Sequence, residues 1–304
     1  GDFKSSISAN VSIIRNKVLK LNTATATYDA GNHPDFSSYD ITRTVVDQPI
    51  QSFYGWETDG IFQSESEISS APTQVTRSYV EGTTTLDNGT GTSPGDIRFK
   101  DLSGPNGVPD GKIDGYDRTF LGSYMPDFSF GINYSGSYKG LDFAIFIQGV
   151  SGNEIYNGTK VLTQGMLRLF NAGTDVLNAW SKPGQATDVP RIAKGDPNQN
   201  TRPSDRFIED GSYIRLKSFT IGYTIPSKFI NSLLKESTLG IRLYVSGQNL
   251  ITLTNYSGYD PEIGSRIPLT ANGSPGTANL LTNGIDYGFM PAARSFIGGI
   301  QINF

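Results

Sequence analysis

Cysteine and histidine are the residues that this sequence lacks. Among its 304 residues there is no cysteine, and His33 is the single histidine. The absence of cysteine excludes a disulfide framework, a thiol nucleophile and a cysteine-ligated zinc site. A Ser-His-Asp triad would have to use His33, which lies in a turn-like segment, and the chain has no GxSxG nucleophile motif. The sequence therefore predicts no catalytic residues.

Long apolar runs and an excess of basic charge are also missing. No stretch approaches the ~18 consecutive apolar residues of a transmembrane helix, and the longest, Leu141–Ile147, is interrupted by Asp142. The formal net charge of -4 argues against binding to nucleic acid. We therefore expect neither a transmembrane helix nor a nucleic-acid partner.

Glycine and aromatic residues are abundant, and the C-terminal residues alternate in polarity. With 35 glycines, 17 phenylalanines and 15 tyrosines, the composition suits a β-rich protein with aromatic belts. Residues 294–304 alternate apolar and polar side chains with the period of two that marks a strand. An outer-membrane barrel commonly ends on such a strand, which faces lipid on one side and a polar lumen on the other. The apolar positions of this strand are Phe296, Ile300, Ile302 and the terminal Phe304.

Alternation and turn residues mark about nine strand candidates along the chain. These candidates are 2–14, 18–29, 38–48, 50–62, 126–138, 140–150, 212–225, 239–252 and 294–304. Short and long connections alternate between them, and the longest are 63–125, 151–211 and 253–293. Outer-membrane barrels have short periplasmic turns and long extracellular loops. The pattern therefore predicts an all-β, antiparallel transmembrane β-barrel with these three segments as extracellular loops, and a soluble β-sandwich is the alternative.

An Asp/Gly-rich segment, residues 101–117, carries the strongest local motif. Oxygen ligands at alternating positions, a glycine at a sharp turn and an acid at the end are typical of a calcium loop. The insertion 105–109 departs from the compact spacing of such loops, and a turn cluster without an ion is the alternative. If Ca²⁺ binds, we expect it to brace a long surface loop. The predicted ligands are the side chains of Asp101, Ser103, Asp110, Asp114 and Asp117 and the carbonyl of Lys112.

Five spaced segments and the final strand resemble the SusC/RagA-type TonB-dependent outer-membrane transporters of Bacteroidetes. The segments are Gln48–Gln63, Gly95–Asp101 with the Asp/Gly loop to Arg118, Thr174–Trp180 with Asp188–Arg191, Arg206–Pro226, and Val245–Leu250 with Gly258–Glu262. The resemblance implies a plugged barrel of about 22 strands, of which residues 1–304 would supply about the last nine. Because the chain opens into a strand without a signal peptide, we expect it to be the C-terminal piece of a longer protein, without the plug and the first strands.

The resemblance also implies a function and partners. Family members pair with a SusD-like surface lipoprotein, and TonB, energised by ExbB and ExbD, acts through the N-terminal plug region. Substrates in the family are oligosaccharides or oligopeptides, and nothing in these residues selects between them or assigns a substrate-binding residue. The final strand would be read by the barrel-assembly machinery, and the outer face of the barrel would contact membrane lipid. The expected function is therefore nutrient uptake at the bacterial outer membrane.

Two alternative functions remain open. One is a SusC-like structural or docking component of another outer-membrane assembly, with no import of its own. The other is a soluble, Ca²⁺-braced, carbohydrate-binding β-sandwich.

Overall fold

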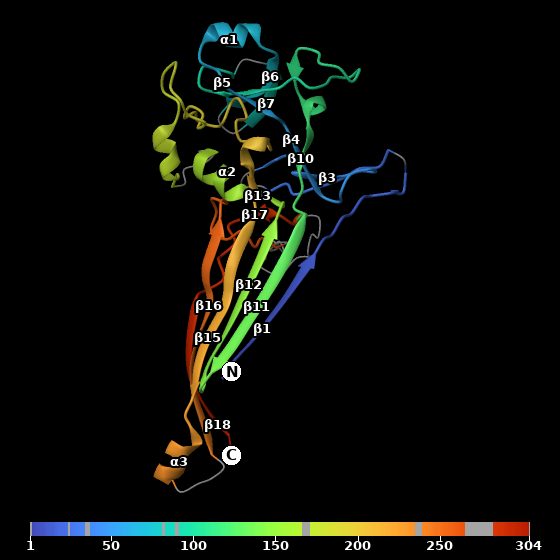
Figure 1. Cartoon of the computed structure of the whole chain (residues 1–304). Coiled ribbons are helices and arrows are strands. Elements are labelled where there is room, and N and C mark those ends of the chain that lie inside the picture. The colour runs from blue at the N-terminus through green and yellow to red at the C-terminus, as the bar shows by residue number, and fades with distance from the viewer. Residues whose placement is uncertain are drawn as a thin grey trace.

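A long antiparallel sheet with a cap of loops, short strands and helices at one end forms the molecule (Figure 1). The computed structural model describes residues 2–23, 25–33, 37–80, 83–88, 91–165, 171–234, 239–264 and 282–303. Within these residues, no helix has the length and apolar character needed to cross a membrane.

Six strands form the long sheet and follow one another in sequence order. Every neighbouring pair is antiparallel. The strands contain 9 to 15 residues, which covers the ~9–11 residues that a tilted membrane strand needs. They are β1 (Phe3–Ser12), β11 (Phe128–Tyr138), β12 (Leu141–Ser151), β15 (Tyr213–Thr224), β16 (Gly240–Thr254) and β18 (Ser295–Asn303).

The two faces of this sheet differ in polarity. The register aligns apolar side chains across neighbouring strands, as Ile7 lies opposite Tyr134 and Tyr134 opposite Ile145. These side chains are not packed into a core, since 71% of Ile7 and 76% of Phe296 are exposed. The apolar face includes Phe3, Ile7, Val11, Ile132, Tyr134, Phe143, Ile145, Phe219, Ile221, Leu243, Val245, Phe296, Ile300 and Ile302. The opposite face is mainly polar and includes Lys4, Ser8, Asn133, Asp142, Gln148, Arg215, Thr220, Arg242, Ser246 and Gln301.

Short connections lie at one end of the sheet and long ones at the other. Lys139 and Gly140 join β11 to β12, and both have positive φ angles (46° and 91°), as a two-residue type I′ turn requires. The connection between β15 and β16 contains the helix α3 (Ser227–Leu234) and lies at the same end (Figure 1). The connections 13–127, 152–212 and 255–294 all lead into the cap.

Three of the nine predicted strands do not join the long sheet. Segments 18–29, 38–48 and 50–62 form only short strands in the cap, so β1 connects to β11 through one long loop, and the sheet has six strands instead of nine. The chain turns at Asp47 and Gln51, whose φ angles are 71° and 57°. The strands of these segments are only three or four residues long, and buried side chains of the segments, such as Ile41 and Phe53, pack into the cap core.

The cap combines four small sheets with short helices. Its strands are β2 (Tyr28–Ala30), β3 (Thr42–Thr44), β4 (Ser52–Gly55), β5 (Thr58–Ile61), β6 (Thr73–Val80), β7 (Thr83–Asn88), β8 (Ile97–Phe99), β9 (Lys112–Ile113), β10 (Thr119–Gly122), β13 (Glu154–Asn157), β14 (Ile208–Asp210) and β17 (Ile285–Asp286). Its helices are α1 (Glu65–Ser70), α2 (Gly158–Gly165), η1 (Gly115–Asp117), η2 (Thr174–Asn178) and η3 (Asp205–Phe207).

The hydrophobic core lies in the cap. One cluster of buried side chains comprises Ile41, Phe53, Tyr156, Val161, Phe207 and Ile285. A second comprises Trp56, Ile97, Phe99 and Ile113. Arg118 and Arg202 lie over faces of the Trp56 ring at 5.1 and 5.3 Å, in the cation–π range. The cap therefore packs as a water-soluble domain does, whereas the sheet exposes its apolar side chains.

Candidate functional site: the polar face and two pockets

A salt bridge crosses the polar face between β12 and β16. The Arg242 guanidinium donates to the Asp142 carboxylate (Nε–Oδ1 2.8 Å) across the intervening strand β15. Gly222 of β15 leaves the room for this contact, because a Cβ at that position would lie 2.4 Å from the guanidinium. The salt bridge therefore links β12 to β16 across β15, on the face that carries most of the polar side chains.

Residues 256–262, here called the strap, fold back over the same face and bind a buried arginine of β15. Arg215 is 2% exposed and donates to Asp260 at 2.5 Å and to Glu262 at 2.8 Å. Its Nε donates to the Thr252 hydroxyl at 2.9 Å, and Lys217 donates to Glu262 at 3.2 Å. Two cations and two carboxylates make this cluster neutral, which offsets the cost of burying Arg215.

The other end of the strap is fixed to the cap. The Tyr256 hydroxyl donates to Asp286 at 2.6 Å. Burial and this hydrogen bond raise the pKa of Tyr256 far above its ordinary value. The backbone N–H and the hydroxyl of Ser257 donate to Glu209 at 2.9 and 3.0 Å. The strap is therefore held at both ends, by the cap and by the sheet.

A pocket of about 460 Å³, here called the strap pocket, lies between the strap, β15–β16 and residues 291–294. Arg294 lines this pocket and makes no hydrogen bond or ion pair with any residue in the described part of the chain. Tyr259, also in the lining, is 70% exposed. The remaining lining residues are Arg215, Asn249, Thr252, Thr254, Asp260, Pro261, Pro291, Ala292 and Ala293.

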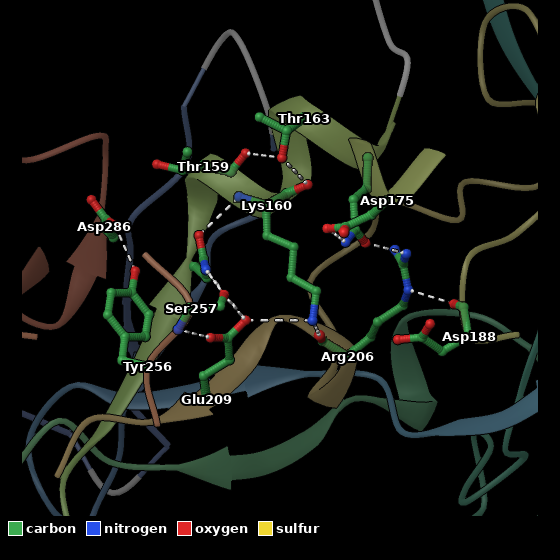
Figure 2. A network of polar contacts seen from close by, with 12 residues as sticks. Thr159, Lys160, Thr163, Asp175, Asp188, Arg206, Glu209, Tyr256, Ser257 and Asp286 are labelled. Carbon is green, nitrogen blue, oxygen red and sulfur yellow. Dashed lines mark hydrogen bonds and ion pairs between the residues drawn. The ribbon is translucent and has the colours of Figure 1, made fainter. Parts of the chain in front are cut away.

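A second pocket, of about 550 Å³, lies in the cap among α2, β14 and the strap (Figure 2), and is called the cap pocket below. Lys160 of α2 pairs with Glu209 of β14 at 3.4 Å, and Asn157 donates to the same carboxylate at 3.2 Å. Burial opposes ionisation of Glu209, but the donors from Ser257, the Lys160 charge and Asn157 outweigh it and hold its pKa below the ordinary value.

Arg206, whose carbonyl accepts from Lys160 at 3.2 Å, holds two further residues of the lining. Its guanidinium donates to the Gln164 side chain at 2.7 Å and to the Asp188 carbonyl at 3.2 Å, and burial lowers its pKa. Gln164 in turn donates to Asp175 at 2.9 Å. The lining carries the carboxylates of Asp175, Asp188, Glu209 and Asp210 against the single ammonium of Lys160. The cap pocket is therefore a polar, negatively charged cavity.

The predicted calcium ligands lie in one loop, but their carboxylates accept hydrogen bonds from backbone amides. Asp101 accepts from Gly111 at 2.7 Å, and Asp117 accepts from Leu102 and Asp114 at 2.8 and 2.7 Å. Asp110 and Asp114 cap the turns at Lys112 and Tyr116, and Ser103 binds Asp117 through its backbone. Burial raises the pKa of Asp117 despite its amide donors. Within the described residues, no group of three or more acidic or histidine side chains is placed to hold a metal ion, and Ca²⁺ binding stays a prediction.

The predicted barrel-assembly signal lies on the edge strand β18, which pairs only with β16 in the long sheet. Phe296, Ile300 and Ile302 are on the apolar face, and they are 76%, 67% and 49% exposed. Phe304 lies outside the described residues. Recognition of this strand by an assembly machinery stays a prediction.

Segments that carry the family resemblance contact one another in the structure. Arg191 donates to both carboxylate oxygens of Asp96, through Nε at 2.9 Å and Nη2 at 3.0 Å. Trp180 packs over Gly95 so closely that a Cβ there would lie 2.3 Å from the indole. Arg215 and Asp260 likewise come from two of these segments. The pairings Arg191–Asp96 and Arg215–Asp260 could not be predicted from the sequence, because opposite charges far apart in sequence carry no local signal of contact. The sequence also gives no signal for Arg294, because its pocket forms only where distant segments meet.

No family model matches the chain. Over all 304 residues it is 34% identical to TonB-dependent receptor P3 of Formosa agariphila, covering 27% of that protein. It is 27% identical to TonB-dependent receptor SusC of Bacteroides thetaiotaomicron over 199 residues, which are 64% of this chain and 17% of SusC. The whole chain also superimposes on 27% of one chain in a structure of the RagAB peptide transporter, with a TM-score of 0.68 and 21% identity. The chain thus spans about a quarter of the length of its first relatives.

A single antiparallel sheet with an exposed apolar face and a polar reverse face defines a segment of a transmembrane β-barrel. The alternative of a soluble β-sandwich, which buries its apolar faces between two sheets, does not fit a sheet whose apolar side chains are exposed, 71% for Ile7 and 76% for Phe296. The predicted resemblance of the chain to the SusC/RagA-type TonB-dependent receptors is confirmed.

Proposed function

We propose that the chain is part of a TonB-dependent transporter that imports oligomeric nutrients across the bacterial outer membrane. The observation that carries the proposal is the two-faced sheet, whose long connections all gather in the cap at one end. Lipid on the apolar side and a water-filled or plugged lumen on the polar side account for both faces. The relatives named as receptors and a transporter support transport, and not catalysis, as the activity.

The cap is the proposed extracellular side and the docking surface for a SusD-like lipoprotein. Segments 63–125, 151–211 and 253–293 contribute to it, and these are the proposed extracellular loops. A TonB–ExbB–ExbD complex would act through an N-terminal plug region. RagAB, whose structure this chain resembles, is a peptide transporter, and for this chain oligopeptides or oligosaccharides are the proposed substrate classes.

The proposal is tested with the full-length parent protein in its native host. A tagged copy is purified from detergent-solubilised outer membranes, the masses of all co-purifying chains are measured, and oligomer uptake is assayed with and without functional TonB. We expect a surface lipoprotein in the complex and uptake that requires TonB. A lipoprotein complex without any uptake would favour a docking role in another outer-membrane assembly. Recovery of the protein from the soluble fraction would contradict both the import role and the docking role.

The C-terminal strand is the proposed signal for barrel assembly. Removal of Phe304 should lower the amount of folded parent protein in the outer membrane, measured by heat-modifiable mobility on gels. Gln301→Asn, on the polar face of the same strand, is the matched control. Equal amounts of folded protein after both changes would contradict a role for the terminal aromatic residue.

A further inference from the structure

We propose that the strap pocket is a binding subsite for a carboxylate group of the imported oligomer and that Arg294 is its main ligand. The inference rests on the proposed function, since it places the subsite on the substrate path.

The strap pocket lies on the polar face of the sheet. Arg215, Thr252 and Thr254 point to the polar face of β15 and β16. Along these strands they alternate with Ile214, Leu216 and Leu253, which point to the apolar face. In a barrel that face borders the lumen. A register shift between Leu216 and Ser218 interrupts the pairing next to the pocket, and Asn249 has a φ angle of 51°. Bulges and left-handed residues of this kind often re-aim side chains beside functional sites.

The strap pocket carries a net positive charge. The cluster beneath the pocket is internally neutral, since Arg215 and Lys217 are matched by Asp260 and Glu262. Arg294 has no such partner in the described ranges and adds one uncompensated positive charge to the lining. The cap pocket has the opposite character, with four carboxylates and one ammonium. Of the two pockets, the strap pocket is therefore the one that suits an anionic group.

The backbone next to Arg294 is held in place before any ligand binds. The residues before Arg294 are held on both sides, because the Ala293 carbonyl accepts from the Asn249 side chain at 3.1 Å and the Ala292 N–H donates to Asp260 at 3.3 Å. The guanidinium at the end of this fixed segment offers two parallel N–H donors, which match the two oxygens of a carboxylate. The exposed ring of Tyr259 provides a second contact surface in the same pocket.

A carboxylate can come from an acidic peptide or from a uronic-acid oligosaccharide, and the experiment distinguishes them. Binding to the full-length transporter with its lipoprotein is measured by calorimetry, using hexaglutamate against hexaglutamine and hexagalacturonate against its methyl ester. The variants are Arg294→Gln and Arg294→Lys, and Lys4→Gln removes one positive charge from the polar face far along the sheet as the control. Heat-modifiable mobility reports folding of every variant.

We expect one acidic probe to bind more tightly than its neutral counterpart. Arg294→Gln should weaken that binding by about 10-fold or more, as expected for a hydrogen bond to a charged group. Arg294→Lys should retain part of the affinity, and Lys4→Gln should retain all of it. Preference for hexaglutamate assigns a peptide carboxylate, and preference for hexagalacturonate assigns a uronate.

Three outcomes would overturn the subsite. These are equal binding of acidic and neutral probes, an Arg294→Gln variant that binds the acidic probe as the wild type does, or an equal loss for acidic and neutral probes. If TonB-dependent uptake persists in any of these cases, the proposed function stands and only the carboxylate subsite fails. If no oligomer is taken up at all, the proposed function fails first.

Discussion

Glu209 is one residue through which pH acts on the cap. Its pKa lies below the ordinary value of 4.5, because the Ser257 donors, Lys160 and Asn157 outweigh the effect of burial. A carboxylate with a lowered pKa stabilises the folded state fully above its unfolded pKa, and this contribution is lost as pH falls through the lower folded pKa. The contact between β14 and the strap should therefore weaken only in acid.

The change Glu209→Gln tests this dependence. We expect the free energy of unfolding of the cap to fall by roughly 1–3 kcal/mol at neutral pH, as for hydrogen bonds to a charged group. The difference from the wild type should shrink as pH falls below about 4.5. The measurement is thermal unfolding of the full-length protein across this pH range. Asp188→Asn, in the same pocket, is the control, and a pH-independent difference for Glu209→Gln would contradict the assignment.

The Asp/Gly loop allows a test of calcium binding at single residues. If Ca²⁺ braces the loop, the double change Asp110→Ala and Asp114→Ala should speed proteolytic cleavage within residues 63–125, and a chelator should do the same to the wild type. The amide hydrogen bonds of Asp101 and Asp117 already close the loop without an ion. If the wild type is cleaved at the same rate with and without chelator, Ca²⁺ does not brace the loop, and the amide hydrogen bonds alone hold it.

At the scale of elements, the cap depends on close contacts between segments distant in sequence. Gly95 and Gly60 both have positive φ angles, 93° and 88°. A Cβ at Gly95 would meet Trp180 and Arg191, whereas at Gly60 nothing lies within 4 Å. A substitution at Gly60 therefore costs only the strain of the backbone conformation, whereas a substitution at Gly95 also displaces neighbouring side chains.

Gly95→Ala should destabilise the cap more than Gly60→Ala. For Gly60→Ala we expect only the conformational cost of a left-handed residue, about 1–2 kcal/mol. Gly95→Ala adds displacement of the Trp180 ring and strain on the Arg191–Asp96 pair. Denaturant unfolding followed by tryptophan fluorescence compares the two, and equal losses of stability would show that the packing around Gly95 relaxes freely.

Also at this scale, the sequence predicted the strands of the long sheet better than those of the cap. The candidates 2–14, 126–138, 140–150, 212–225, 239–252 and 294–304 each correspond to a strand of that sheet. Candidates 18–29, 38–48 and 50–62 were assigned to it wrongly. Both groups alternate in polarity, but alternation is local, so it does not distinguish a strand that pairs in the long sheet from one that pairs in a short sheet of the cap.

For the whole molecule, the polarity of the two faces predicts how the sheet tolerates charge. Ile300 and Gln301 are neighbours on β18 that point to opposite faces, and Ile300 is 67% exposed. Ile300→Lys should destabilise the barrel by about 2–4 kcal/mol if it lies near the bilayer midplane, whereas Gln301→Lys should have little effect. Folding of the full-length protein into lipid vesicles provides the measurement, and equal effects of the two changes would contradict the assignment of the faces.

The sequence by itself determined the different polarity of the two faces of the sheet and the end at which the long connections lie. These properties follow from a period of two in polarity and from short turns, which are both encoded by neighbouring residues. Only the tertiary structure decided which alternating segments join the sheet and how the strap and the cap are held. The Arg215–Asp260 and Arg191–Asp96 pairs join residues 45 and 95 positions apart, and such pairings depend on how the long loops close. The physical reason is that side-chain alternation is local, whereas the partner of a buried charge is set by the fold.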